Sequence, residues 1–335
     1  MHNSILSAIG NTPLVKLTRV FDDLQFNLYA KLEAFNPGGS SKDRPAFKII
    51  RRGIESGAIV PGKTVVIESS SGNMGIGLAQ ACSYYGVHFI CVVDVKATLQ
   101  NIRLLEAYGA EVELVSEPDP VTGELLQSRI DRVKSLLFSI PDSFWPNQYA
   151  NPDNPLAHHH TIEEIAAQLD GKIDYLFCAT STCGTIRGCV EYIREHSLDT
   201  KTYAVDAVGS VIFGNVKACR LIPGHGAAVR PPLFHSDIAD DCIHVTDLDC
   251  VINCHHLVRR EAILAGGSSG AVIAAIRRVK HLIPEGANCV AILPDRGERY
   301  LDTIYSESWV TEHFGDIAHH WQGKLEAETC ATATY

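Results

Sequence analysis

A lysine at an expected helix start is the residue in this sequence with the clearest chemical potential. Lys42 follows a loop of one proline, two glycines and two serines, and it precedes an apolar-periodic run with Pro45 in its first turn. This order predicts a helix that begins at Lys42. The positive end of a helix dipole disfavours an ammonium, which lowers its pKa and frees the amine as a nucleophile. A loop lysine in solvent would have the same local sequence.

Two further loops have donors suited to anions. Segment 69–75, Ser-Ser-Ser-Gly-Asn-Met-Gly, follows an expected strand and opens an expected helix, so its hydroxyls and N–H groups suit a carboxylate. Segment 180–185, Thr-Ser-Thr-Cys-Gly-Thr, also lies between a strand and a helix and suits a phosphate, although it lacks the lysine of a Walker loop. Each segment could also be a simple helix cap. Together they predict a ligand with two anionic ends.

A third loop, Gly266 to Gly270, reads Gly-Gly-Ser-Ser-Gly and precedes another expected helix. Small residues there would let the backbone approach a flat ring closely. On its own this loop predicts only a turn and a cap. The three loops and the upstream lysine together favour a ligand-binding site.

The elements that would position these loops alternate along the chain. We predict strands at 64–67, 89–93, 112–115, 175–178, 203–205 and 290–293, and helices at 75–85, 99–108, 124–137, 155–169, 185–195 and 270–282. This alternation predicts an α/β fold with parallel, twisted, helix-covered sheets, and ligands in such sheets bind at the strands' carboxyl ends.

A polar break at 146–152 splits the alternating elements into two groups. We therefore predict a smaller domain at 35–149, a larger domain formed by 1–34 plus 150–315, and a fraying tail at 316–335.

The composition excludes several classes of protein. The chain has 335 residues, 46% of them hydrophobic, and a net charge of -10 without a lysine and arginine cluster, which argues against nucleic acid or an anionic membrane as partner. Its 11 cysteines form no Cys-x-x-Cys pair, and no apolar run approaches the roughly 18 residues of a membrane span. We therefore predict reduced thiols in a cytoplasmic protein.

Three adjacent histidines, His158 to His160, raise the question of a metal site. Neighbouring side chains on a helix point about 100 degrees apart, so these rings cannot converge on one ion. We predict no metal.

Several motifs, taken in order, resemble the cysteine synthase and cystathionine β-synthase family of fold-type II pyridoxal-phosphate enzymes, over roughly residues 4 to 310. The motifs are Asn-Thr-Pro-Leu-Val at 11–15, the lysine loop, Ser-Gly-Asn at 71–73, Asn-Gln-Tyr-Ala-Asn-Pro at 147–152, the loops at 181–185 and 266–270, and Gly-Glu-Arg-Tyr-Leu at 297–301. The resemblance implies a tryptophan synthase β-like fold, with pyridoxal 5'-phosphate in the cleft between the two domains. It also implies a homodimer.

The resemblance also implies roles for single residues. Lys42 would form the Schiff base and later serve as base for the substrate α-proton, Asn73 would contact the ring hydroxyl, and Ser268 would face the pyridine nitrogen. A serine at that nitrogen gives a weaker electron sink that suits β-elimination. The cofactor phosphate would be held by Ser181, Thr182, Cys183, Gly184 and Thr185, and the substrate α-carboxylate by Ser70, Ser71 and Gln148.

The loops depart from the cysteine synthase pattern in three places. Met74 and Ser70 replace threonines in the asparagine loop, Ser181 and Cys183 replace glycines in the phosphate loop, and Asp295-Arg296 replaces two serines. These changes adjoin the cofactor, so they predict altered substrates, with Met74 facing them.

Further segments resemble the branch of the family that makes N-(2-amino-2-carboxyethyl)-L-glutamate, a precursor of 2,3-diaminopropionate in siderophores and peptide antibiotics. They are 117–119, 144–149, 205–214 and 293–297. In that branch O-phospho-L-serine loses phosphate to leave an aminoacrylate, which the amine of L-glutamate attacks.

Both of these substrates are polyanionic, so the site needs cations beyond Lys42. Arg129 is the first candidate because its helix should face the cleft, and Arg220 and Arg230 are alternatives. Tyr149 could bond a substrate phosphate or carboxylate, or be a core aromatic.

Two other functions stay open at this point. An O-acetylserine or O-phosphoserine sulfhydrylase would share every step up to the acrylate, and the sequence does not settle the nucleophile. A non-catalytic cofactor-binding regulator is also open, although it would be expected to lose Lys42 or the loops. A dinucleotide-binding dehydrogenase is disfavoured, since no Gly-x-Gly-x-x-Gly follows the first strand.

Overall fold

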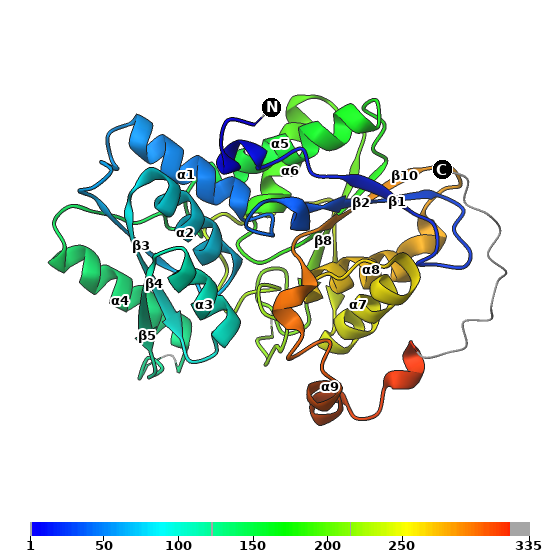
Figure 1. Ribbon diagram of the computed structural model, residues 1–335. Helices are drawn as coiled ribbons and strands as arrows, with labels where there is room; N and C mark the ends of the chain where they lie inside the picture. Colours follow the sequence, from blue (N-terminus) through cyan, green and yellow to red (C-terminus); the bar gives the residue numbers. More distant parts are fainter. Residues whose placement is uncertain (1, 122, 215, 322–335) are drawn as a thin grey trace.

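Two separate β-sheets organise the protein, seen in a computed structural model that describes residues 2–121, 123–214 and 216–321 (Figure 1). The six-stranded sheet has the order β1-β2-β10-β7-β8-β9, and the four-stranded sheet has the order β5-β4-β3-β6. The strands are β1 (Leu14–Leu17), β2 (Asn27–Leu32), β3 (Val65–Ser69), β4 (His88–Asp94), β5 (Glu111–Val115), β6 (Ser143–Phe144), β7 (Tyr175–Ala179), β8 (Lys201–Ala207), β9 (Asp241–Val245) and β10 (Asn288–Leu293).

Nearly all strand pairs are parallel, as predicted. The exception is β1, which pairs antiparallel with β2 at the edge of the six-stranded sheet. Val15 in β1 is exposed and Lys16 bonds Asn27 at the surface, so this edge strand does not need the helical cover of a parallel strand.

Helices cover both sheets. They are α1 (Asp43–Glu55), α2 (Asn73–Tyr85), α3 (Leu99–Ala107), α4 (Leu125–Ser139), α5 (Asp153–Gln168), α6 (Gly184–Glu195), α7 (Asp247–Glu261), α8 (Gly267–Val279) and α9 (Glu307–Phe314), with short 3-10 turns between some of them. In Figure 1 α2, α3 and α4 surround the four-stranded sheet, and α7 and α8 lie against the six-stranded one. Helices α1 and α5 pack together where the two halves meet.

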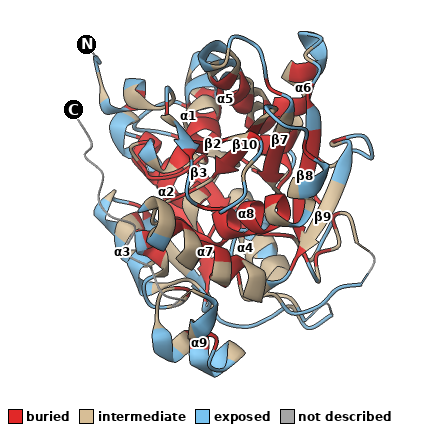
Figure 2. Ribbon diagram, turned by 90° about the vertical axis from the view of Figure 1, so that its right-hand side faces the viewer, coloured by how far each residue is buried: buried red, intermediate tan, exposed pale blue. Residues whose placement is uncertain are grey.

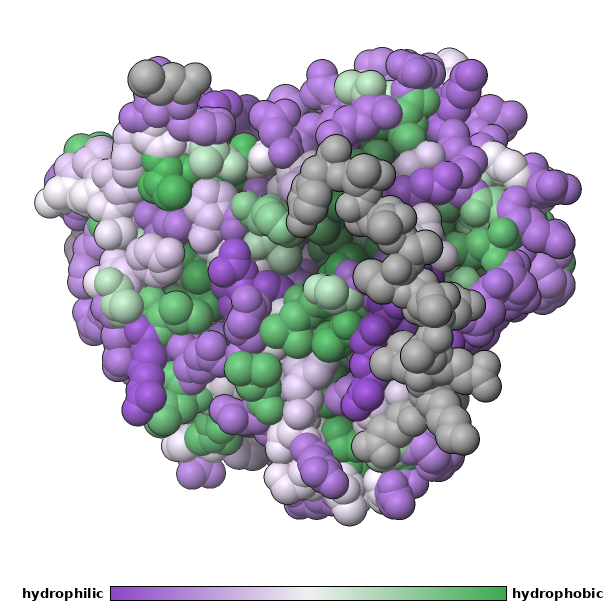
Figure 3. All heavy atoms as spheres, turned by 45° about the vertical axis from the view of Figure 1, so that its right-hand side comes forward, coloured by the Kyte–Doolittle hydropathy of each residue, from purple (hydrophilic) through white to green (hydrophobic). Residues whose placement is uncertain are grey.

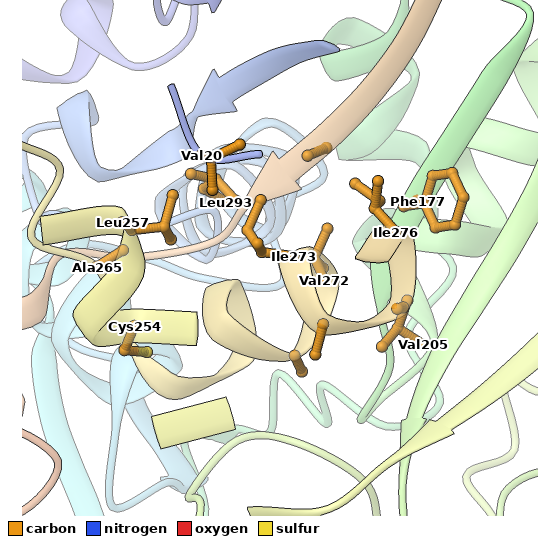
Figure 4. Close-up of a cluster of buried hydrophobic side chains, with 14 of the residues drawn as sticks. Val20, Phe177, Val205, Cys254, Leu257, Ala265, Val272, Ile273, Ile276 and Leu293 are labelled. Atoms are coloured by element: carbon orange, nitrogen blue, oxygen red, sulfur yellow. The ribbon is translucent and has the colours of Figure 1, made fainter. Parts of the chain in front are cut away.

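The hydrophobic core is divided in the same way as the sheets. One cluster fills the space between the six-stranded sheet and α7 and α8, and Figure 4 shows Ile273 and Ile276 of α8 in it beside Phe177 and Leu293. Another lies on the opposite face, under α5 and α6. Two further clusters cover the faces of the four-stranded sheet. Figure 2 shows the result: central strands and α8 are buried, while α3 and α9 face outward.

The predicted elements are confirmed with shifted ends, and some elements were missed. The largest shift is at α8, which begins at Gly267 rather than Gly270, so the predicted loop forms its first turn. Strand β9 and helix α7 were not predicted, although Thr246 and Asp249 form a capping box at the start of α7.

The strands of each sheet fall within one of the two predicted domains, and the domain boundaries themselves stay a prediction. The predicted tail begins with ordered residues: Ile317 is 7% exposed and the Trp321 ring stacks on His255 at 4.0 Å. Residues 322–335 lie outside the described part of the chain. No described helix is long and apolar enough to cross a membrane.

Candidate active site

Lys42 lies at the helix start that the sequence predicts, as the N-cap residue of α1. Its side chain is half-buried, and its Nζ donates a hydrogen bond to Ser41 Oγ at 3.2 Å. Burial lowers the pKa of the Lys42 amine, while nearby Cys178 and Asp295 oppose this shift. A lowered pKa was predicted from the helix dipole, but burial is the main physical cause here.

The loop before Lys42 is bonded to the loop that follows β10. Ser41 N donates to Pro294 O at 2.7 Å, Arg296 N donates to Gly39 O at 3.2 Å, and Ser40 forms a β-bridge with Asp295. These backbone bonds place the lysine at the carboxyl end of β10.

A buried ion network lies directly beyond Lys42. Arg44 in α1 pairs with Glu33 at 2.7 Å and with Glu164 of α5 at 2.7 Å, and Lys31 of β2 also pairs with Glu164, at 2.6 Å. The Lys31 and Glu33 side chains have no exposed surface, and Thr12 donates to Glu33 at 2.7 Å. The network joins α1 to the six-stranded sheet and to α5, so the backbone beside Lys42 is firmly fixed.

Asn73 is the first residue of α2 and reaches from the four-stranded half to the loop after β10. Its Nδ2 donates to Asp295 Oδ2 at 2.8 Å, and Arg299 donates to its Oδ1. Tyr300 also donates to Asp295 Oδ2, at 2.5 Å. Burial raises the pKa of Asp295, and its bonds to Tyr300 and Asn73 oppose this.

Asp295 and Arg299 were not predicted as site residues. The available signals were Asp295 among the departures that adjoin the cofactor and Arg299 within the family motif at 297–301. Their partner Asn73 is 222 and 226 residues away in the chain, and no local pattern encodes such a contact.

Arg129, the first candidate for a substrate-binding cation, contacts the asparagine loop, and its role toward the substrate stays a prediction. Arg129 lies in α4 and donates from Nη1 to Ser71 Oγ at 2.9 Å, and its Nε is 3.1 Å from Asp94 Oδ2. Ser70 Oγ instead accepts from Gly75 N at 2.9 Å, so this hydroxyl caps the turn into α2. The hydrogen bond to Ser71 therefore holds the Arg129 guanidinium against the asparagine loop.

Gln148 and Tyr149 lie next to this loop. Gln148 is buried and donates from Nε2 to Ser69 O at 3.3 Å. Burial raises the pKa of the Tyr149 hydroxyl, and the charge of Arg129 opposes the shift. Beneath them the buried Glu68 carboxylate accepts from Ser69 N at 2.8 Å, Gln148 N at 3.1 Å and Trp145 Nε1 at 3.2 Å.

Met74 is placed differently from the other predicted substrate residues. It is 2% exposed and packs in a hydrophobic cluster under α2. The structure therefore does not bring its side chain to the polar groups of the loop, and its role stays a prediction.

The predicted phosphate loop turns into α6. Cys183 is the N-cap residue with φ of 68°, a left-handed conformation that favours glycine. A Cβ on Gly184 would lie 2.1 Å from Asn154 Oδ1, and Asn154 Nδ2 donates to Thr182 Oγ1 at 3.3 Å. Thr185 Oγ1 bonds His158 Nε2 at 3.2 Å. The first N–H groups of α6 have no acceptor within the helix, which suits an anion. Ser181, the remaining residue of this loop, is partly exposed.

Ser268 lies in the first turn of α8 and is 8% exposed. The adjacent Gly266 donates from its N to Asp295 O at 3.2 Å, so this turn also adjoins the loop after β10. Of the alternative cations, Arg220 donates to His225 O at 2.9 Å, next to Gly226, whose N donates to Thr180 O at 2.7 Å, and Arg230 stacks on Phe234 at 4.9 Å.

The three adjacent histidines have three different sets of partners. The buried His158 bonds Thr161 and Thr185, His159 faces Glu191, and His160 pairs with Glu163. Among the described residues no group of three His, Cys, Asp or Glu side chains could hold a metal ion. The ten described cysteines are free.

Comparison with known proteins gives consistent matches. The family profile described as "Pyridoxal-phosphate dependent enzyme" matches residues 5–295. An N-(2-amino-2-carboxyethyl)-L-glutamate synthase of Ralstonia nicotianae is 46% identical over 308 residues, covering 92% of this chain and 90% of the relative. The synthase of the same name from Cupriavidus metallidurans is 46% identical over 312 residues, covering 92% and 91%.

A solved structure is also similar over most of its length. The crystal structure of a hydrogen sulfide-producing enzyme from Fusobacterium nucleatum has a TM-score of 0.83 and 34% identity, covering 90% of this chain and 98% of that one.

Proposed function

Because this chain belongs to the family of pyridoxal-phosphate dependent enzymes, with the fold of its fold-type II members, we propose that it joins O-phospho-L-serine to L-glutamate. The products are N-(2-amino-2-carboxyethyl)-L-glutamate and phosphate. In this reaction the β-carbon to oxygen bond of phosphoserine breaks, a bond from that carbon to the glutamate nitrogen forms, and the amine loses a proton. The two relatives named N-(2-amino-2-carboxyethyl)-L-glutamate synthase, each 46% identical to this chain, support the proposal.

Three observations support a cofactor site around Lys42. The Lys42 amine has a lowered pKa, which leaves it free to bond a carbonyl carbon. The loop 181–185 presents the start of α6 to a phosphate, and Gly184 leaves room there for the Asn154 side chain that bonds the loop. Asn73 and Gly266, which lies two residues before Ser268, both donate hydrogen bonds to the buried Asp295. Pyridoxal phosphate, when bound, supplies an electron sink that acidifies the α-proton of an amino acid.

The chain's own residues then have distinct roles. Lys42 takes the proton from the substrate α-carbon and later returns it. Ser70, Ser71 and Gln148 bind the α-carboxylate, with Tyr149 beside them. The residues that would hold the cofactor phosphate are Ser181, Thr182, Cys183, Gly184 and Thr185.

The observation that carries the choice of donor is Arg129. Its guanidinium bonds Ser71 within the asparagine loop and also pairs with Asp94, so an arginine lies beside the residues proposed to bind the substrate carboxylate. O-phospho-L-serine has a dianionic leaving group, and glutamate adds a second carboxylate. A cation fixed in this position favours such a substrate pair.

The test supplies the holoenzyme with O-phospho-L-serine and each candidate acceptor. Phosphate release should depend on L-glutamate, and mass spectrometry should detect the joined product. Faster turnover of O-acetylserine with sulfide than of phosphoserine with glutamate would refute the proposal. That outcome would favour a cysteine synthase, the second candidate, which the 34% identity to a hydrogen sulfide-producing enzyme supports.

We further propose that the enzyme works as a cytoplasmic homodimer in 2,3-diaminopropionate or siderophore biosynthesis. Family resemblance supports this assignment. On the face in Figure 3, hydrophobic residues lie in small groups among hydrophilic ones. Light scattering of the purified holoenzyme should give twice the mass of the 36.5 kDa chain.

A further inference from the structure

The side-chain amide of Asn73 is held at both ends by one loop of the other half of the protein. Its Nδ2 donates to Asp295 Oδ2 at 2.8 Å, and its Oδ1 accepts from Arg299. A carboxylate only accepts hydrogen bonds and a guanidinium only donates them. Only one of the two amide orientations therefore satisfies both partners.

Asp295 is itself tightly fixed. It is 2% exposed, Tyr300 donates to its Oδ2 at 2.5 Å, and its backbone oxygen accepts from Gly266 N. A Cβ at Gly266 would lie 2.1 Å from Asp295 Oδ1, so only glycine fits beside this carboxylate. Oδ1 is buried and has no partner among the described residues. The carboxylate thus offers Oδ2 to Asn73 in a constant direction.

Arg299 is fixed in the same manner. Its second terminal nitrogen donates to Gly38 O in the lysine loop, and the side chain is 8% exposed. The guanidinium therefore joins the lysine loop to Asn73. Asn73 begins α2 in the four-stranded half, whereas Asp295 and Arg299 follow β10 of the six-stranded half.

An asparagine Nδ2 has two hydrogens, and Asp295 takes only one of them. We propose that Asp295 and Arg299 are positioning residues that direct the second N–H of Asn73 to the ring oxygen of the cofactor. This rests on the cofactor site assigned above and not on the identity of either substrate. A donated N–H stabilises the ionised form of that oxygen.

The test compares two substitutions of Asp295 in the holoenzyme without substrate. Both remove the negative charge, but Asp295→Asn retains an oxygen that accepts from Asn73, whereas Asp295→Ala does not. The measurement is the pH at which the visible absorption of the bound cofactor titrates. We expect Asp295→Ala to titrate about one pH unit higher than Asp295→Asn, since a lost hydrogen bond to an ionised group shifts its pKa by about this amount.

Two further variants complete the design. Glu298→Gln makes the same acid-to-amide change at an exposed position of the same loop and should titrate like the wild type. Tyr300→Phe removes the hydroxyl that fixes Asp295 without changing any charge. It should raise the pH at which the cofactor absorption titrates above the wild-type value, but by less than one pH unit. It replaces Asp295→Ala if that variant does not fold.

Equal titration of Asp295→Ala and Asp295→Asn would refute the proposal. So would an unchanged titration of Tyr300→Phe if Asp295→Ala cannot be studied. Because no substrate is added, failure of the phosphoserine and glutamate reaction would leave these results unaffected.

Discussion

The asparagine loop at 69–74 and the phosphate loop at 180–185 begin from the same design, a strand that leads through small polar residues into a helix. They are supported differently. Charged side chains from distant segments reach the asparagine loop, namely Arg129, Asp295 and Arg299. The phosphate loop has a left-handed residue at Cys183 and uncharged partners on the neighbouring helix α5. One loop is fixed by charge and the other by shape.

The largest expected effect tests the dependence of the phosphate loop on shape. Gly184→Ala would place a Cβ 2.1 Å from Asn154 Oδ1, and we expect a loss of about 3 kcal/mol in the free energy of unfolding, together with weaker cofactor binding. Gly72→Ala in the asparagine loop has open space around its Cβ and should cost less than about 1 kcal/mol. For each variant, urea denaturation measures the free energy of unfolding and cofactor absorbance measures cofactor binding. Equal losses in the two variants would contradict the comparison.

The second prediction concerns the charge beneath the asparagine loop. Burial raises the pKa of Glu68 from 4.5 to about 7, so the folded state binds this proton more tightly than the unfolded chain. The resulting stability is full below pH 4.5 and is lost as the pH rises through 7. Glu68→Gln does not titrate. Its free energy of unfolding relative to the wild type should therefore rise by roughly 2–3 kcal/mol between about pH 5 and pH 8.

Denaturation at several pH values checks this prediction, and Glu55→Gln is its control. Glu55 is exposed and pairs with Arg51 on the surface, so that variant should follow the wild type at every pH. The raised pKa of Asp43 is present in all three proteins and cancels in the differences. A constant difference between Glu68→Gln and the wild type would show that Glu68 does not titrate in this range.

The third prediction concerns the cation of the asparagine loop. Arg129→Gln should lower kcat/KM for O-phospho-L-serine by about 10- to 100-fold, the effect of one lost charged hydrogen bond, with cofactor absorbance unchanged. Arg132→Gln, one turn along the same helix, breaks only a partly exposed pair with Glu113 and should retain activity. Steady-state kinetics distinguishes them. Similar kinetics for the two variants would remove Arg129 from the site.

The smallest effect is expected at Cys183. Cys183→Gly relieves the left-handed backbone but loses a thiol that is 2% exposed, and these terms of about 1 kcal/mol each nearly cancel. Cys189→Gly, within the regular part of α6, has no strain to relieve and should cost about 2 kcal/mol. Thermal denaturation compares the two. An equal cost would mean that Cys183 is not strained.

The same contrast explains what the sequence could predict. The helix starts predicted at Lys42 and Thr185 follow from local glycine and hydroxyl residues before an apolar run, and the structure has both within one residue. Helix α7 was missed although Thr246 and Asp249 carried a capping signal. The clamp on Asn73 could not be predicted, because its partners are more than 200 residues away and meet it only through tertiary packing.

The ion network around Arg44 has a kinetic consequence. Four buried or nearly buried charges anchor the chain two residues after Lys42, and backbone bonds from Ser41 and Gly39 anchor it just before. The backbone on both sides of Lys42 is therefore rigid, while its side chain can still change rotamer. Any proton that its amine transports must travel by rotation about side-chain single bonds, which is intrinsically much faster than movement of a loop or domain. Slow steps in turnover should then reflect substrate entry or product escape, and not the reach of the base.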